Sequence, residues 1–240
     1  MRQESDMDTE EERITDAARN TEILRLPKQT LATFGTTNIG YYLVTKPIYA
    51  KLTRDVAETV VREGRVIADK PRIVTPYYLS QLEGFSTDAK RYFEMLIKTQ
   101  GPNVPGLFYS YRNEPRGLTI VSENLDMVVA RLNGEIDRLG DPLVSIIKGQ
   151  DELWDVSLMK FIFEITRSSI QDNLLQFRNR GLLDVDAGGV PMDARVRIEE
   201  LFRQLIHGEI EPRVLKDELE RWGLFEEYQD RFFSIFRRRW

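Results

Sequence analysis

The sequence predicts an α+β fold, with a small, mostly antiparallel sheet in the N-terminal half and an all-helical C-terminal half. Segments rich in β-branched and aromatic residues, separated by short turn-like loops, fill most of residues 28–121. From Ser122 onward, apolar residues recur every three or four positions, as on one face of a helix. The loops between the predicted strands are too short for crossover connections, so we expect little parallel pairing.

The composition is that of an ordinary globular chain, and it excludes several kinds of site. The 240 residues are 41% hydrophobic and 30% charged, which suffices for one large domain or two small ones. The chain has no cysteine and one histidine, which excludes disulfides, Cys-based zinc sites and two-His metal motifs. The sequence also has no glycine-rich phosphate motif, so we predict no cofactor, no metal ligand and no catalytic residue.

Charge and hydropathy indicate a cytoplasmic protein. The net charge of −5 argues against bulk attraction to nucleic acid or anionic lipid. No apolar run reaches the ~18–20 residues of a membrane span, and the acidic N-terminus has no hydrophobic signal segment. We therefore expect an intracellular chain with no membrane span.

The chain divides by composition into three regions. Residues 1–22 carry eight carboxylates and few large apolar groups, so we expect a disordered acidic arm, with a short helix around residues 10–19 as the alternative. Residues 23–121 form the α+β, sheet-forming region. Residues 122–240 form the helical region.

Turn chemistry divides the first half into hairpins. Residues 30–34 and 39–44 flank a Gly-Thr-Thr-Asn loop and predict a first hairpin. Residues 59–61 and 65–68 flank an Arg-Glu-Gly turn, in which Gly64 would take a left-handed conformation, and predict a second hairpin. Three further strands and one helix complete this half, the strands over residues 72–75, 107–111 and 118–121 and the helix over residues 89–97.

The second half contains amphipathic helices bounded by glycine and proline. A helix over residues 125–139 ends at Gly140, and a long segment follows from residue 153 to residue 177. Its first half is apolar nearly all round, which is typical of a buried central helix, and Ser168-Ser169 is a candidate break. Three more helices are predicted, over residues 193–207, 212–222 and 224–240.

One loop has the residue types of an anion site. Thr36, Thr37 and Asn38 lie between Gly35 and Gly40, and their hydroxyl, amide and backbone N–H groups could bind a phosphate or carboxylate. The same residue types are common in tight turns. An enzyme with a phosphate- or carboxylate-binding site at this loop is one alternative function.

Two further polar features have simpler interpretations. Residues 184–195 begin like a calcium loop, but Arg195 stands where a bidentate glutamate is needed, so we interpret the segment as a Gly-Gly turn before a helix. His207 lies at a predicted helix C-terminus, where the helix dipole favours its charged form.

Residues 151–207 offer a second alternative. The succession of a helix over residues 170–183, a short strand–turn–strand and a closing helix resembles the second half of a winged-helix DNA-binding module. The resemblance implies a nucleic-acid-binding regulator, although acidic residues in the wing would repel phosphate. The candidate nucleic-acid contacts are Arg178, Arg180, Arg195 and Arg197.

The C-terminal helix carries an aromatic stripe that must be covered. Its members recur near a spacing of 3.6, and such a stripe left in water would be a large apolar patch. The cover is either the protein's own core or a partner chain. The candidate partner-binding residues are Phe232, Phe236 and Trp240.

Together these patterns favour a non-catalytic, intracellular interaction or regulatory protein that acts through helical surfaces. We expect a protein partner or self-association. A nucleic-acid-binding regulator and an enzyme acting at the loop of residues 35–40 remain the alternatives.

Overall fold

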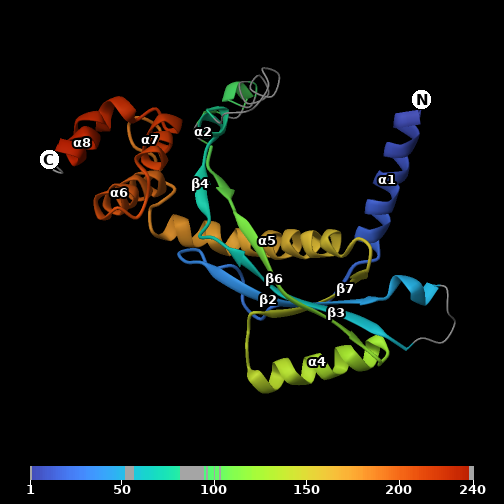
Figure 1. Ribbon diagram of the computed structural model, residues 1–240. Coiled ribbons are helices and arrows are strands. Elements are labelled where there is room, and N and C mark those ends of the chain that lie inside the picture. Colours follow the sequence, from blue (N-terminus) through green and yellow to red (C-terminus); the bar gives the residue numbers. More distant parts are fainter. Residues whose placement is uncertain are drawn as a thin grey trace. The chain divides into compact units, whose positions relative to one another are not determined.

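The computed structural model describes residues 2–51, 57–81, 95, 97–99, 101–102 and 104–237. It confirms the α+β class: most of a five-stranded mixed sheet comes from the N-terminal half, and the C-terminal half is mostly helical (Figure 1). In the described residues, no helix has both the length and the apolar character needed to cross a membrane.

The chain folds into two compact units, each made of two stretches. Unit 1 comprises Met1–Lys70 and Tyr109–Asn173, and unit 2 comprises Pro71–Phe108 and Leu174–Trp240. The consecutive regions 23–121 and 122–240, expected from composition, describe where strands and helices concentrate along the chain and not these units.

Unit 1 contains the sheet and the helices that cover it. Its elements are α1 (Arg2–Arg19), β1 (Glu22–Arg25), β2 (Thr37–Lys46), the 3-10 helix η1 (Ile48–Lys51), β3 (Thr59–Ala68), β6 (Tyr111–Val121), α4 (Leu125–Leu139), β7 (Val144–Gln150) and most of α5 (Trp154–Asn179). Helix α1 lies where the sequence predicts an acidic arm with a helix as its alternative, and Ala17 near its end is fully buried.

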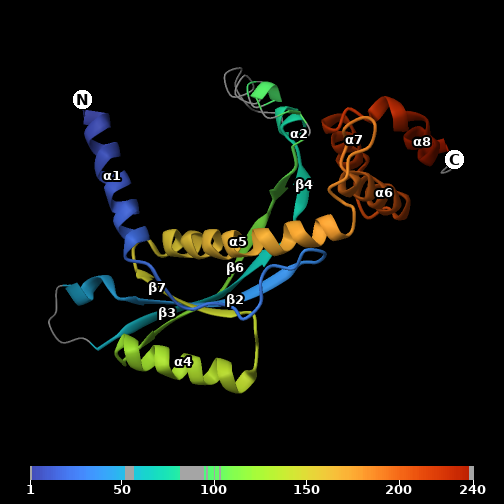
Figure 2. The ribbon, with the colours of Figure 1, turned by 180° about the vertical axis from the view of Figure 1, so that it is seen from behind.

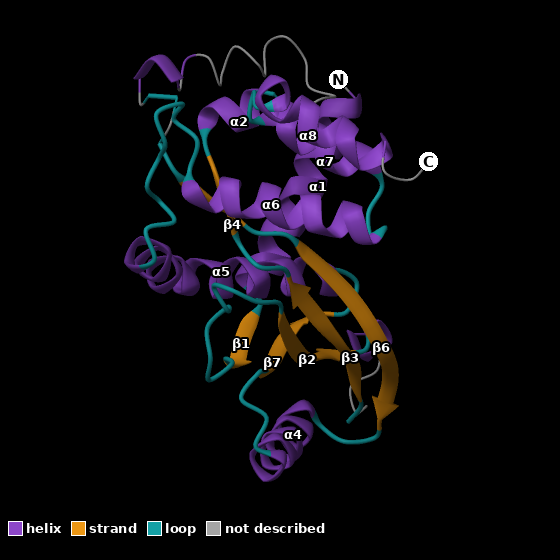
Figure 3. Cartoon of the chain, turned by 90° about the vertical axis from the view of Figure 1, so that its left-hand side faces the viewer, coloured by secondary structure: helices purple, strands orange, loops and turns teal. Residues whose placement is uncertain are grey.

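The sheet has the strand order β1-β7-β2-β3-β6. The β2–β7 pair is parallel, in register from Gly40↔Val144 to Lys46↔Gln150, and the other three pairs are antiparallel. Strand β7 is a correction to the prediction of an all-helical second half. The prediction of limited parallel pairing is confirmed, because three of the four strand pairs in this sheet are antiparallel. Helices α4 and α5 cover opposite faces of the sheet (Figures 1, 2 and 3).

Two apolar cores lie on the two faces of this sheet. Ile39, Tyr41 and Leu43 of β2 pack with Phe161 and Ile165 of α5 on one face. On the other face, Val44 and Ile146 pack with three α4 side chains, Val128, Leu132 and Ile136. The alternation along β2 therefore assigns its residues to one core or the other.

The predicted first hairpin is wrong. Residues 30–34 form no strand, and β2 begins at Thr37. The segment before β2 is held against α5 instead, because the Leu31 N–H donates to Ser169 Oγ at 3.0 Å and Thr33 Oγ1 donates to Asn173 Oδ1 at 2.8 Å.

The predicted second hairpin is also wrong, because β3 continues through the predicted turn. Gly64 does not have a positive φ angle. It lies opposite Tyr41 of β2 and Pro115 of β6, at a bulge in the β3–β6 pairing. A side chain there would overlap the Tyr41 hydroxyl, so glycine is required for close packing rather than for a turn.

The helices of unit 1 match the prediction in one case and differ in another. Helix α4 has the predicted bounds, with Asn124 accepting from the Met127 N–H at its start and Gly140 left-handed at its end. Helix α5 runs unbroken for 26 residues. The hydroxyls of Ser168 and Ser169 donate to the Ile165 carbonyl, so these residues continue the helix rather than break it.

Unit 2 is a helical core with a two-stranded sheet. Its elements are β4 (Arg72–Val74), α2 (Pro76–Ser80), β5 (Gly106–Phe108), α6 (Met192–His207), α7 (Pro212–Arg221), α8 (Phe225–Arg237) and the last residues of α5. The Ile73 N–H donates to Asp193 Oδ2 at 3.0 Å, which ties β4 to the start of α6. Most of the predicted helix over residues 89–97 lies outside the described residues.

Replacing Gly64 by alanine should destabilise unit 1. The added Cβ would lie 2.9 Å from the Glu114 carbonyl oxygen as well as against Tyr41, so the backbone of the sheet would have to shift. We expect the free energy of unfolding to fall by about 1–3 kcal/mol, as for an overpacked core. The matched control is Gly117→Ala in β6, where the Cβ would meet no atom within 4 Å. Urea unfolding measures both variants, and equal stability would contradict this account of Gly64.

Candidate functional site

An exposed apolar surface lies on unit 1 where α5 passes β6. On α5, Met159 and Phe163 are 63% and 62% exposed and lie one helical turn apart. The same stripe of the helix continues to Thr166, which is hydrogen-bonded to Tyr111 of β6. Met159 and Phe163 therefore lie on the flank of α5 that faces the β6 side of the sheet.

Strand β6 contributes two more exposed aliphatic residues. Leu118 and Ile120 are 57% and 52% exposed. They pair with Arg62 and Val60 of β3, and Arg62 stacks on Trp154 of α5, so both point to the α5 face of the sheet. We call Leu118, Ile120, Met159 and Phe163 the α5–β6 surface.

A buried polar cluster fixes the start of α5 on the sheet. Arg62 Nη1 lies 2.6 Å from Asp151 Oδ1, and Thr45 Oγ1 donates to the same oxygen at 2.8 Å. Both charged side chains are largely buried, so the pair is shielded from water. The cluster joins β2 and β3 to the turn that follows β7.

A cavity of about 340 Å³ lies at the carboxyl ends of the parallel strands β2 and β7. Ligands of open α/β sheets bind at such ends. Lys46 and Lys148 bring positive charge, but Lys148 Nζ donates to Glu22 Oε1 at 2.9 Å. Asp151 and Glu152 line the cavity together with Glu22, so three carboxylates face two lysines and the lining does not select an anionic ligand.

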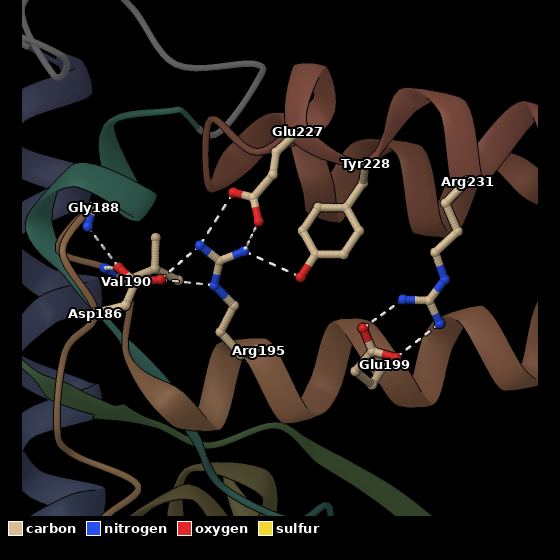
Figure 4. A network of polar contacts seen from close by, with 8 residues as sticks. All are labelled: Asp186, Gly188, Val190, Arg195, Glu199, Glu227, Tyr228 and Arg231. Carbon is tan, nitrogen blue, oxygen red and sulfur yellow. Dashed lines mark hydrogen bonds and ion pairs between the residues drawn. The ribbon is translucent and has the colours of Figure 1, made fainter.

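In unit 2, a network of ion pairs joins α6, α8 and the turn before α6 (Figure 4). Asp186 accepts from the backbone N–H groups of Gly188 and Val190 and from Arg195 Nε, at 2.8–3.0 Å. Arg195 also donates to both carboxylate oxygens of Glu227 and to the Tyr228 hydroxyl. A second bidentate pair joins Glu199 of α6 to Arg231 of α8, which also lies over the Phe202 ring.

The network shifts the titration of its members. Burial acts to raise the pKa of Asp186, but the three donors outweigh it and the pKa is lowered. Burial acts to lower the pKa of Arg195, but its hydrogen bonds to Glu227, Asp186 and Tyr228 raise it. The hydrogen bond from Arg231 lowers the pKa of Glu199. These charged forms are therefore part of the folded structure of unit 2.

The predicted anion loop contributes one of its three residues to the fold. The Thr37 hydroxyl accepts a hydrogen bond from the Ala32 N–H at 2.8 Å, and Thr37 is buried at the start of β2. Thr36 and Asn38 are exposed. Ligand binding by Thr36, Thr37 and Asn38 stays a prediction.

The four predicted nucleic-acid contacts differ in their surroundings. Arg195 is enclosed in the network of Figure 4, and Arg197 Nε lies 3.3 Å from the buried Glu218 carboxylate. Arg178 and Arg180 are exposed at and just beyond the end of α5. The wing appears as one antiparallel bridge between Val185 and Pro191. Two of the four guanidinium groups thus serve ion pairs within unit 2, and DNA binding stays a prediction.

The aromatic residues of the C-terminal helix pack mainly within unit 2. Phe232 is 6% exposed in the core, and Phe236 packs against that core. Phe225, Phe233 and Phe236 surround the Phe232 ring edge-on at 5.4–5.8 Å. Trp240 lies outside the described residues. Partner binding through Phe232, Phe236 and Trp240 stays a prediction, but Phe232 is covered by its own unit.

The calcium-like loop and His207 are the two remaining polar candidates. The Asp186 carboxylate caps the turn of the calcium-like loop, and His207 lies in the last turn of α6, before the left-handed Gly208. Within the described residues, no group of three His, Asp or Glu side chains could hold a metal ion.

The sequence patterns do not single out the α5–β6 surface as a binding site. Its signal in the sequence is the apolar character of α5 on nearly all sides, which predicts burial. In comparisons with known proteins, no family model matches the chain, and no curated protein or solved structure is significantly similar to it.

Replacing Phe232 by alanine should destabilise unit 2 strongly. Removal of a buried ring leaves a cavity that costs about 3–5 kcal/mol. The matched control is Phe233→Ala on the same helix, because Phe233 is 48% exposed and should lose much less. Similar losses for the two variants in thermal unfolding would contradict the placement of α8.

The Asp186 pair should make unit 2 sensitive to acid. Because the pKa of Asp186 is lower in the folded state, its contribution to stability is complete at neutral pH. That contribution is lost as pH falls below about 4, through the lowered pKa. Asp186→Asn should cost about 1 kcal/mol at pH 7, and the difference should vanish near pH 2. Asp217→Asn, which breaks an exposed pair with Arg213, should cost less at every pH in urea unfolding.

Proposed function

We propose that this chain is a non-catalytic interaction or regulatory protein that binds a protein partner through a helical surface, the α5–β6 surface of unit 1. One observation carries the proposal: the sequence of α5 does not match its surroundings. The first half of the helix is apolar nearly all round, which is typical of a helix covered on every side. The sheet covers one side of it, and Met159 and Phe163 stay largely exposed.

The arrangement of the exposed residues supports a binding surface. Single exposed apolar residues are ordinary on protein surfaces, whereas contiguous patches mark interaction sites. Here two exposed residues lie on adjacent turns of α5, and two more lie on the face of β6 that points to the α5 side of the sheet. Methionine and aromatic side chains are also enriched in the buried centre of protein interfaces.

The opposite flank of α5 is already engaged within unit 1. Lys160 Nζ donates to the carbonyl oxygens of Ala18 and Thr21, at 2.8 and 3.0 Å. This flank is therefore occupied by the segment that joins α1 to β1. The flank with Met159 and Phe163 is the one that a partner of α5 would contact.

The charged clusters also support a binding role over catalysis. Asp151 pairs with Arg62, Asp186 with Arg195, and Glu218 with Arg197. Each of these carboxylates forms an ion pair that connects different segments of the chain. We therefore assign these charged groups a structural role.

Site-specific photo-crosslinking tests the proposal. A photoreactive phenylalanine analogue at position 163 replaces one exposed ring by another, so the fold should be unchanged. In lysate of the source organism we expect a discrete protein adduct at this position.

The control places the same analogue at Leu139, which is 73% exposed at the end of α4. Position 139 should give no such adduct. Adducts of equal yield at positions 139 and 163, or no adduct at either position, would contradict the proposal.

A further inference from the structure

Strand β6 ends the sheet of unit 1, and one of its edges has no strand partner among the described strands. The strand is 11 residues long and pairs with β3 alone. Along the other edge, alternate N–H and C=O groups point away from the sheet. Such an edge is a template for pairing with another strand.

The two halves of β6 differ in how they resist pairing. The first half contains Pro115, which has no N–H to donate, and the charged residues Arg112, Glu114 and Arg116. A bulge in the β3–β6 pairing lies at the same place. Residues 117–121 have neither charge nor proline, and both Leu118 and Ile120 are exposed there.

We propose that residues 117–121 of β6 pair antiparallel with the same residues of a second copy of this chain, with Thr119 opposite Thr119. The two five-stranded sheets then form one continuous sheet across a two-fold axis. The inference rests on the function proposed above, because it names the partner of the α5–β6 surface.

The sequence around Thr119 is self-complementary in this register. Leu118 lies opposite Ile120 of the partner subunit, and the two-fold axis repeats that apolar pair. The two threonines face each other on the other side of the sheet, which is a favourable cross-strand pair. Arg116 lies opposite Ser122 of the partner subunit, so the charged half of β6 begins where the five paired residues end.

The neighbouring two-fold registers pair less compatible residues. A register centred on Leu118 sets Arg116 opposite Ile120 and brings Pro115 into the paired segment. A register centred on Ile120 sets Leu118 opposite Ser122 and Gly117 opposite Glu123. The register centred on Thr119 matches every aliphatic residue with an apolar one and excludes Pro115 from the pairs.

Helix α5 lies beside the seam that this pairing creates. A two-fold axis perpendicular to the sheet keeps both copies of α5 on the same face. Leu118 and Ile120 then form the floor of the seam, and Met159 and Phe163 of the two copies flank it. The four exposed residues of the α5–β6 surface are thus covered by one symmetric contact.

Single cysteines test the register, because the chain has no native cysteine. In full-length Thr119→Cys, the paired cysteines face each other at about 4.5–5.5 Å between Cβ atoms, so mild oxidation should give a covalent dimer. In Ser122→Cys the two residues lie about 20 Å apart along the strands, so no covalent dimer should form. Mass spectrometry under non-reducing conditions measures the amount of covalent dimer for both variants.

Sedimentation tests the association itself. The wild-type chain should be a dimer, and Ile120→Lys should raise the dissociation constant at least tenfold, because an edge lysine opposes strand pairing. Leu139→Lys, at an exposed site outside the seam, should leave it unchanged.

Three outcomes would overturn the inference: a monomeric wild-type chain, crosslinking of Ser122→Cys as efficient as that of Thr119→Cys, or equal effects of the two lysine variants. The adduct formed at position 163 distinguishes failure of the self-pairing inference from failure of the proposed interaction function. An adduct with a different protein would leave the interaction function standing and refute self-pairing. An adduct with twice the mass of the chain supports both.

Discussion

Strand β2 determines the arrangement of unit 1, because both of its edges and both of its faces are used. It pairs antiparallel with β3 on one edge and parallel with β7 on the other. Ile39, Tyr41 and Leu43 pack under α5, while Val44 packs under α4. A strand covered on both faces has no polar side, and a slip of one residue would exchange its two cores. The register of β2 therefore sets the position of both helices. It also sets the position of β3, which holds β6, and of Thr45, which meets Asp151 before α5 begins.

Local patterns were sufficient for the fold class and for α4, because both depend on residues close together in the sequence. The caps Asn124 and Gly140 define α4 without any reference to the sheet. The errors occurred where a distant neighbour decides the outcome. Gly64 suits a tight turn equally well, and only the ring of Tyr41 shows that it serves close packing. Strand β7 was missed because a short strand that contains Lys148 and Gly149 differs little from a loop until β2 lies beside it.

The candidate sites were less predictable than the fold, for a related reason. A sequence shows which side chains are charged but not which charges are already paired. Arg195 has the residue type of a phosphate contact, yet Asp186 and Glu227 engage it from the turn before α6 and from α8. The apolar pattern of α5 predicts burial within the chain, yet Met159 and Phe163 are exposed. Such a pattern predicts a covered helix and contains no information about which molecule supplies the cover.

The two edges of the sheet show why that distinction matters for β6. Strand β1, at the other edge, has four residues, an irregular register and ion pairs from Glu22 and Arg25, which are features that oppose pairing between sheets. Strand β6 has comparable protection up to Arg116 and none over residues 117–121. One sheet therefore has a protected edge and an edge that is protected over half its length. Because an exposed apolar edge favours aggregation, its persistence in a folded chain is most simply explained by a specific contact that covers it. The proposed pairing also brings a partner to the uncovered flank of α5, so it offers one physical cause for two separate departures from ordinary packing.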